Sequence, residues 1–128
     1  MEITVGIQGQ ATTLVEPEDT ALSVGSGSLR VFATPCMAAL MEGAACEALE
    51  GLLPEGKTSV GTELNISHLS ATPVGMEVTA TATVIAVEGN TVIFSLTASD
   101  EAGKIGEGTH KRVIVSEQKF LDKVYQKL

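Results

Sequence analysis

Three polar residues interrupt otherwise apolar patterns in this sequence and could together form a catalytic group. His68 ends a row of alternating apolar residues, Glu42 lies within an apolar helical segment, and Thr34 stands where that segment starts. An imidazole, a carboxylate and a hydroxyl are the groups used in nucleophilic and general acid–base catalysis. We expect the strand that ends at His68 to lie over the helix start, bringing His68 near both Thr34 and Glu42.

Each of these residues also has a purely structural interpretation. His68 can be a core histidine whose ring bonds a backbone carbonyl. Glu42 can be a solvated residue at the margin of the helix, and Thr34 can serve only as a helix cap. Their convergence therefore carries more weight than any one of them.

One long helix should position Thr34 and Glu42. Thr34 is expected at the N-cap and Pro35 at the first helical position, where its missing N–H has no cost. Pro54 and Gly56 are expected to stop this helix. Apolar residues recur at steps of three and four between these limits: Met37, Leu40, Met41, Ala44, Ala45, Ala48, Leu49 and Leu52. Many of them are small, so other backbones can approach closely, as a sheet wrapped around a helix would require.

Extended segments flank the helix. Alternation at Ile3, Val5 and Ile7 predicts a first strand. Four more strands are predicted at 58–69, 76–88, 91–100 and 104–115, and a last amphipathic helix follows Ser116. In the strand that ends at His68, the side chains of Val60, Leu64, Ile66 and His68 should share the face toward the helix.

This order of elements predicts an α+β fold. One antiparallel sheet packs against one helix, and a sheet rolled around its central helix is the hotdog arrangement. The chain shows no repeat or linker, so we expect a single domain over residues 1–128.

Charge and composition exclude several classes of partner. The net charge of −8 and the aromatic content of 3% argue against nucleic-acid binding. No apolar run approaches the roughly 20 residues that span a bilayer. The start of the chain lacks a secretory signal, which favours a cytoplasmic protein. Six of the eight bases lie in residues 104–128, so a local cationic patch could meet an anionic ligand.

The two cysteines fit the same compartment. Cys36 and Cys46 are ten residues apart in one helix, about 15 Å along its axis, and cannot bridge each other. We expect both to be buried free thiols and Cys36 to be structural rather than nucleophilic.

A set of motifs distributed over nearly the whole chain resembles the fluoroacetyl-CoA-thioesterase-like family. The motifs are Asp19-Thr20-Ala21, Val24-Gly25-Ser26-Gly27, Val31-Phe32-Ala33-Thr34-Pro35, Met41-Glu42, Ser59-Val60-Gly61-Thr62, His68-Leu69 and Gly108-Thr109-His110-Lys111-Arg112. The resemblance implies a hotdog fold, a homodimer and hydrolysis of acyl-CoA thioesters without a cofactor or metal.

The resemblance also implies residue roles. Thr34, Glu42 and His68 map onto the family's catalytic group, Gly61 onto its substrate-binding backbone amide, and Arg112 onto its cleft arginine. An amide N–H can stabilise the developing oxyanion, and an arginine fork suits phosphate or carboxylate.

Two features of the sequence are not explained by the resemblance. His110 shares a strand face with Arg112 but is given no role. The stretch 21–31 contains no aromatic residue, which argues against a bulky lid suited to one tiny fluorinated acyl group.

Two other functions compete with thioester hydrolysis. A non-catalytic acyl-CoA-binding module would bind CoA without turnover. A hydratase or dehydratase would use a histidine and a carboxylate placed differently on the same fold.

Overall fold

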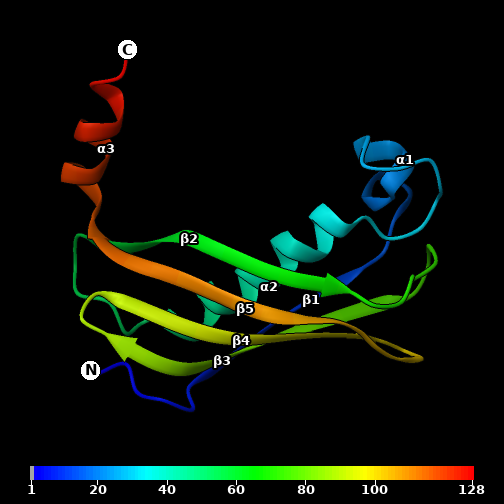
Figure 1. Ribbon diagram of the computed structural model, residues 1–128, viewed down its shortest axis with the longest axis horizontal. Coiled ribbons are helices and arrows are strands. Elements are labelled where there is room, and N and C mark those ends of the chain that lie inside the picture. The colour runs from blue at the N-terminus through cyan, green and yellow to red at the C-terminus, as the bar shows by residue number, and fades with distance from the viewer. Residues whose placement is uncertain (1) are drawn as a thin grey trace.

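The computed structural model describes residues 2–128 and consists of one five-stranded antiparallel sheet curved around a central helix (Figure 1). The strands are β1 (Gln8–Leu14), β2 (Lys57–His68), β3 (Glu77–Glu88), β4 (Thr91–Asp100) and β5 (Gly103–Ser116), in the order β1-β3-β4-β5-β2. The helices are η1 (Pro17–Asp19, a 3₁₀ turn), α1 (Ala21–Val24), α2 (Thr34–Leu49) and α3 (Glu117–Tyr125). This is the α+β arrangement that the sequence predicts.

Both ends of α2 differ from the prediction. Ala33 is the N-cap and Thr34 is already the first helical residue. The Thr34 hydroxyl is therefore free to bond elsewhere. The helix ends at Leu49, before the predicted stop at Pro54, because Gly51 adopts a left-handed conformation with φ 77°. Leu52 consequently lies outside the helix.

The core forms between α2 and the concave face of the sheet. Met37 and Met41 of α2 are fully buried, and they pack in one cluster with Phe94 and Leu96 of β4. A Cβ atom at Gly9 of β1 would overlap backbone atoms of α2. The small residues of α2 thus allow a strand to cross the helix at backbone distance, as the sequence predicts.

The prediction of a strand at Ile3, Val5 and Ile7 is wrong. Gly6 has φ 98°, and the backbone N–H of Ile7 bonds the carbonyl of Thr4, so this segment turns. The strand begins at Gln8. Ile3 and Ile7 still pack on the core, whereas Val5 is exposed. The apolar spacing therefore marked core contacts of a turn rather than a strand.

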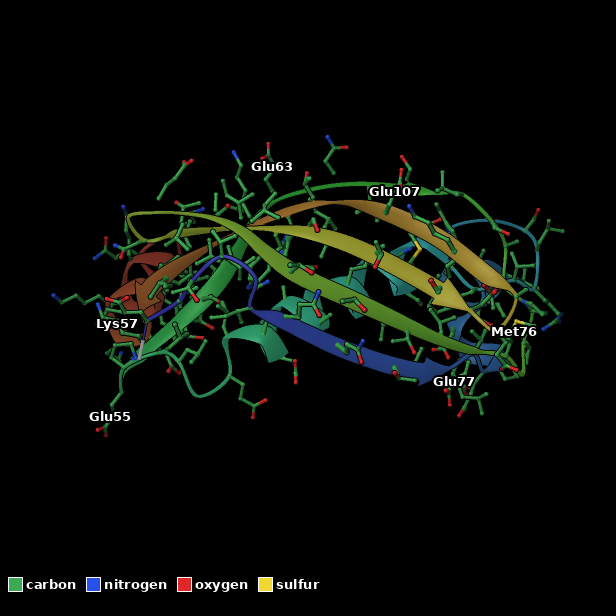
Figure 2. The ribbon with its side chains drawn as sticks, turned by 90° about the horizontal axis from the view of Figure 1, so that it is seen from below. Glu55, Lys57, Glu63, Met76, Glu77 and Glu107 are labelled. Carbon is green, nitrogen blue, oxygen red and sulfur yellow. The ribbon has the colours of Figure 1, made fainter. Side chains whose placement is uncertain are left out.

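A β-bulge in β2 changes which residues face α2. The register between β2 and β5 shifts between Gly61, which pairs with Arg112, and Glu63, which pairs with Lys111. Figure 2 shows Glu63 on the outer face of the sheet. Thr62 is the extra residue, so the alternation restarts after it. Gly61 and Leu64 consequently face the helix together, and Val60 points to the opposite face from the one predicted.

The cysteines agree with the prediction only in part. Cys36 and Cys46 are both free, as predicted, but neither is fully buried, because Cys36 is half-buried and Cys46 is exposed. Among residues 2–128 no helix combines the length and the apolar character needed to cross a membrane.

Candidate active site

Thr34 and His68 form the first of two polar clusters on the inner face of the sheet. The hydroxyl of Thr34 lies 2.7 Å from Nδ1 of His68. The other ring nitrogen, Nε2, is buried and has no hydrogen-bond partner among the described residues. Burial lowers the pKa of His68 below its ordinary value of 6.5, so the neutral imidazole is favoured at neutral pH. A neutral ring with an unused nitrogen can accept or pass a proton.

The Thr34–His68 pair lines a pocket of about 280 Å³. Its walls come from α1 and the following loop, the start of α2 and the segment after β2: Ala21, Ser26, Val31, Phe32, Leu69, Ser70 and Ala71. None of these wall residues except Phe32 is large and aromatic, and Phe32 itself is 2% exposed. The accessible lining of the pocket therefore combines polar and small aliphatic side chains, with little aromatic surface.

Glu42 anchors the second cluster, with β2 and β5. Its Oε2 lies 3.5 Å from Nη1 of Arg112 and 3.8 Å from Nε2 of His110. Arg112 is 7% exposed and His110 is 1% exposed, whereas the Glu42 side chain is 42% exposed. A buried guanidinium therefore neutralises a carboxylate that still reaches the surface.

Hydrogen bonds to neighbouring residues hold the guanidinium of Arg112 in place. Its Nε donates to Oγ of Ser59 at 2.8 Å, and its Nη2 donates to the Ser59 carbonyl at 3.0 Å. The remaining terminal nitrogen faces Glu42 and His110. The Arg112 side chain is therefore buried beside Glu42. It does not lie on an exposed surface where it could bind phosphates.

Gly61 is the residue of β2 that faces this cluster. A Cβ atom on Gly61 would lie 2.8 Å from Oε2 of Glu42, 3.1 Å from Cε1 of His110 and 3.4 Å from Nη1 of Arg112. Any side chain at this position would displace the carboxylate, so glycine is required for the observed position of Glu42.

Replacing Gly61 with alanine should lower kcat roughly tenfold or more by moving the Glu42 carboxylate. Stability should change little, because the overlapped atom is the end of a flexible side chain. Gly43→Ala is the matched control, since a Cβ there meets only Ala11 at 3.9 Å. Equal kcat values for the two variants, measured with the same substrate, would contradict this role of Gly61.

The two clusters do not meet within one chain. Thr34 and Glu42 are eight residues apart in α2, about 12 Å along the helix axis. The predicted approach of His68 is therefore realised for Thr34 but not for Glu42. Instead, Glu42 meets Gly61 and Arg112.

A family model for fluoroacetyl-CoA-specific thioesterase matches residues 15–118. The chain belongs to this family. It is 42% identical over 97 residues to the fluoroacetyl-CoA thioesterase of Streptantibioticus cattleyicolor, covering 76% of this chain and 70% of that protein. A solved structure of a fluoroacetyl-CoA thioesterase superposes with a TM-score of 0.93 at 34% identity, covering 100% of this chain and 99% of the other. A hot-dog-like protein from Thermanaerovibrio acidaminovorans superposes with a TM-score of 0.90 at 32% identity, covering 98% and 93%.

Membership in the fluoroacetyl-CoA-specific thioesterase family confirms the predicted hotdog fold and the predicted class, a thioester hydrolase. His110 is the site residue that sequence reasoning left without a role. Its only signal was its place two residues before Arg112, on the same strand face. The contact with Glu42 depends on the position of α2 relative to β5, which no local pattern encodes.

Proposed function

We propose that this chain hydrolyses acyl-CoA thioesters with Thr34, Glu42 and His68 as its catalytic group. The observation that carries the proposal is a half-exposed carboxylate held by a buried arginine, on the same sheet face as a Thr–His pair. Gly61 and Arg112 are proposed to contact the substrate near its thioester end. For Arg112 this follows from its 7% exposure, which argues against a role at the CoA phosphates.

The reaction adds water across the thioester. Glu42 either removes a proton from water or attacks the carbonyl carbon itself to give an anhydride that water then opens. In both routes a C–O bond forms, the C–S bond breaks, and the CoA thiolate takes a proton. The products are the free acid and CoA. Neutral His68 is the proposed proton carrier, and the Thr34 hydroxyl orients it. These steps use water and side chains alone, so we propose that no cofactor takes part.

We also propose that the active site is completed in a homodimer. β2 is an edge strand of 12 residues, and such an edge favours pairing with a second strand. In an antiparallel pairing of β2 with its copy over their full length, the half of one strand that contains Gly61 runs beside the half of the other that ends at His68. We propose that this brings the Thr34–His68 cluster toward Glu42 of the second copy. The separation of about 12 Å within one chain supports this arrangement.

The terminal helix gives independent support for a second copy. Figure 1 shows α3 standing away from the sheet on the side of β2. Four of its side chains, Phe120, Leu121, Val124 and Tyr125, are 38–63% exposed. The amide of Glu117 bonds the carbonyl of Gly56, so α3 starts at the Lys57 end of β2. An antiparallel β2 pairing would place it near the exposed Leu69 of the partner chain. The exposed apolar side chains of α3 and the exposed Leu69 of the second copy would then cover each other.

A mixing experiment tests the shared site. Glu42→Gln and His68→Ala variants should each be inactive alone. Mixed and allowed to exchange chains, they should recover about a quarter of the wild-type turnover per chain, since half of the dimers are mixed and each mixed dimer has one intact site. No recovery, despite mixed dimers detected by native mass spectrometry, would place the whole site within one chain. A monomer by light scattering would contradict the dimer itself.

The range of acyl groups that the protein accepts is inferred from the residues near the pocket. A variant of fluoroacetyl-CoA thioesterase has been solved with fluoroacetate and CoA, which supports a CoA thioester as substrate here. Because the 21–31 segment carries no aromatic side chain, we expect turnover of several small acyl-CoAs rather than strict selection of the fluorinated one.

A panel of acyl-CoAs with a thiol-detecting reagent measures this selectivity. Release of CoA thiol from more than one substrate is the expected result. Tight binding without thiol release would favour an acyl-CoA-binding module. Loss or gain of an enoyl double bond without thiol release would favour a hydratase.

The free thiols of Cys36 and Cys46 fit a reducing compartment. We therefore propose a cytoplasmic location.

A further inference from the structure

We propose that His110 is a positioning residue that holds Arg112 against Glu42 as a neutral imidazole protonated on Nδ1. The proposal rests on the proposed catalytic role of Glu42. It assigns a function to a buried histidine that the steps above do not use.

The hydrogen bonds of His110 define one tautomer. Its Nδ1 lies 2.8 Å from the carbonyl oxygen of Glu63, which can only accept. Its Nε2 lies 3.1 Å from Nη1 of Arg112, which can only donate. Nδ1 must therefore carry the proton, and Nε2 must be the acceptor. A ring protonated on both nitrogens would point an N–H at the guanidinium.

The charged groups facing the ring favour the same state. Glu42 of α2 is the carboxylate beside it, but its Oε2 is 3.8 Å from Nε2, beyond hydrogen-bond distance. Arg112 of the same strand is nearer, and it stands 3.5 Å from that carboxylate. The arginine therefore supplies the positive charge beside Glu42, and Nε2 of His110 faces that cation as a hydrogen-bond acceptor.

His110 and Ser59 hold the guanidinium of Arg112 by hydrogen bonds from two sides. Ser59 accepts from Nε and Nη2, and His110 accepts from Nη1, the nitrogen nearest Glu42. The imidazole itself has little freedom, because it is 1% exposed and stacks on Phe94 with ring centroids 6.2 Å apart. The bulge in β2 lies between Gly61 and Glu63, so the carbonyl that fixes the tautomer belongs to the same irregularity that places Gly61 beside Glu42.

Two substitutions separate the two ends of the ring. His110→Gln can place a carbonyl oxygen near the Nε2 position and still accept from Arg112. His110→Asn can place an amide nitrogen near the Nδ1 position and keep the bond to Glu63, but it leaves Arg112 without its acceptor. We expect kcat to fall roughly 10- to 100-fold in the Asn variant, with KM changed less, and to be largely retained in the Gln variant. Denaturant midpoints of both variants verify that folded protein is compared.

Nitrogen-15 NMR of the histidine-labelled wild-type protein reads the tautomer without any activity measurement. The resonances of His110 should show a protonated Nδ1 and an unprotonated Nε2 at neutral pH. An Nε2–H tautomer or an imidazolium would overturn the assignment, whatever the protein hydrolyses. Equal kcat values in the folded Gln and Asn variants would overturn the positioning role. If Glu42 proved not to be catalytic, the NMR result would still stand, so the two failures are distinguishable.

Discussion

Glu42→Gln should lower kcat by roughly 10²–10⁴-fold, the range over which a positioned base or acid contributes to catalysis. The amide has the shape of the carboxylate but neither its charge nor its basicity. It can serve neither as the nucleophile nor as the base that activates water. The measurement is steady-state hydrolysis of the best acyl-CoA from the panel.

Stability should respond much less than turnover. The Glu42 side chain is 42% exposed, so water can replace part of its interaction with Arg112. Glu50→Gln is a suitable control, because it also removes a carboxylate from the helix region but at an exposed position beyond the last turn of α2. Wild-type turnover of the Glu42 variant, or an equal loss in the Glu50 variant, would remove Glu42 from the mechanism.

His68→Ala should lower kcat by about a hundredfold or more if the imidazole carries protons. The expected pH profile follows from its environment. Burial lowers the pKa of His68, so the acid limb of kcat/KM should lie below pH 6.5, and activity should fall as the ring becomes protonated. The limb should disappear from the residual activity of the variant.

The competing interpretation of His68 predicts a different pair of results. A histidine that only fills the core should cost about 1–3 kcal/mol on truncation, through lost packing and an unpaired Thr34 hydroxyl. Turnover per folded molecule would then be normal. Measuring kcat and the denaturant midpoint on one preparation distinguishes the two, because only the catalytic role separates activity from stability.

The regular elements of this fold can be predicted from the sequence because their buried residues recur at the spacing typical of a helix or a strand. The buried residues of α2 follow helical spacing from Met37 to Leu49, and β3 and β4 alternate buried and less buried positions along most of their length. The N-terminal segment is not readable in this way. β1 contains Gly9 where a core residue would be expected, since α2 crosses it too closely for a side chain. The apolar alternation from Ile3 to Ile7 belongs to a turn that precedes β1.

For the site, the sequence predicts the residue types but only some of their contacts. Thr34 and His68 meet as expected, because the strand β2 ends beside the start of α2. The neighbours of Glu42 cannot be predicted from local patterns, because its contact with His110 depends on how α2 lies against β5. The bulge, which no periodicity signals, is what turns Gly61 toward Glu42.

The bulge also determines how β2 should respond to the loss of a residue. Thr62 is exposed, and its hydroxyl bonds only the Lys111 carbonyl, so substitution there should be tolerated. Gly61 and His68 are seven residues apart, an odd number, so both face the helix only because the bulge takes up Thr62. Without Thr62 they would be six residues apart, and a regular strand would direct both to the helix. A relative that lacks this residue should therefore lack the bulge as well and still keep both clusters.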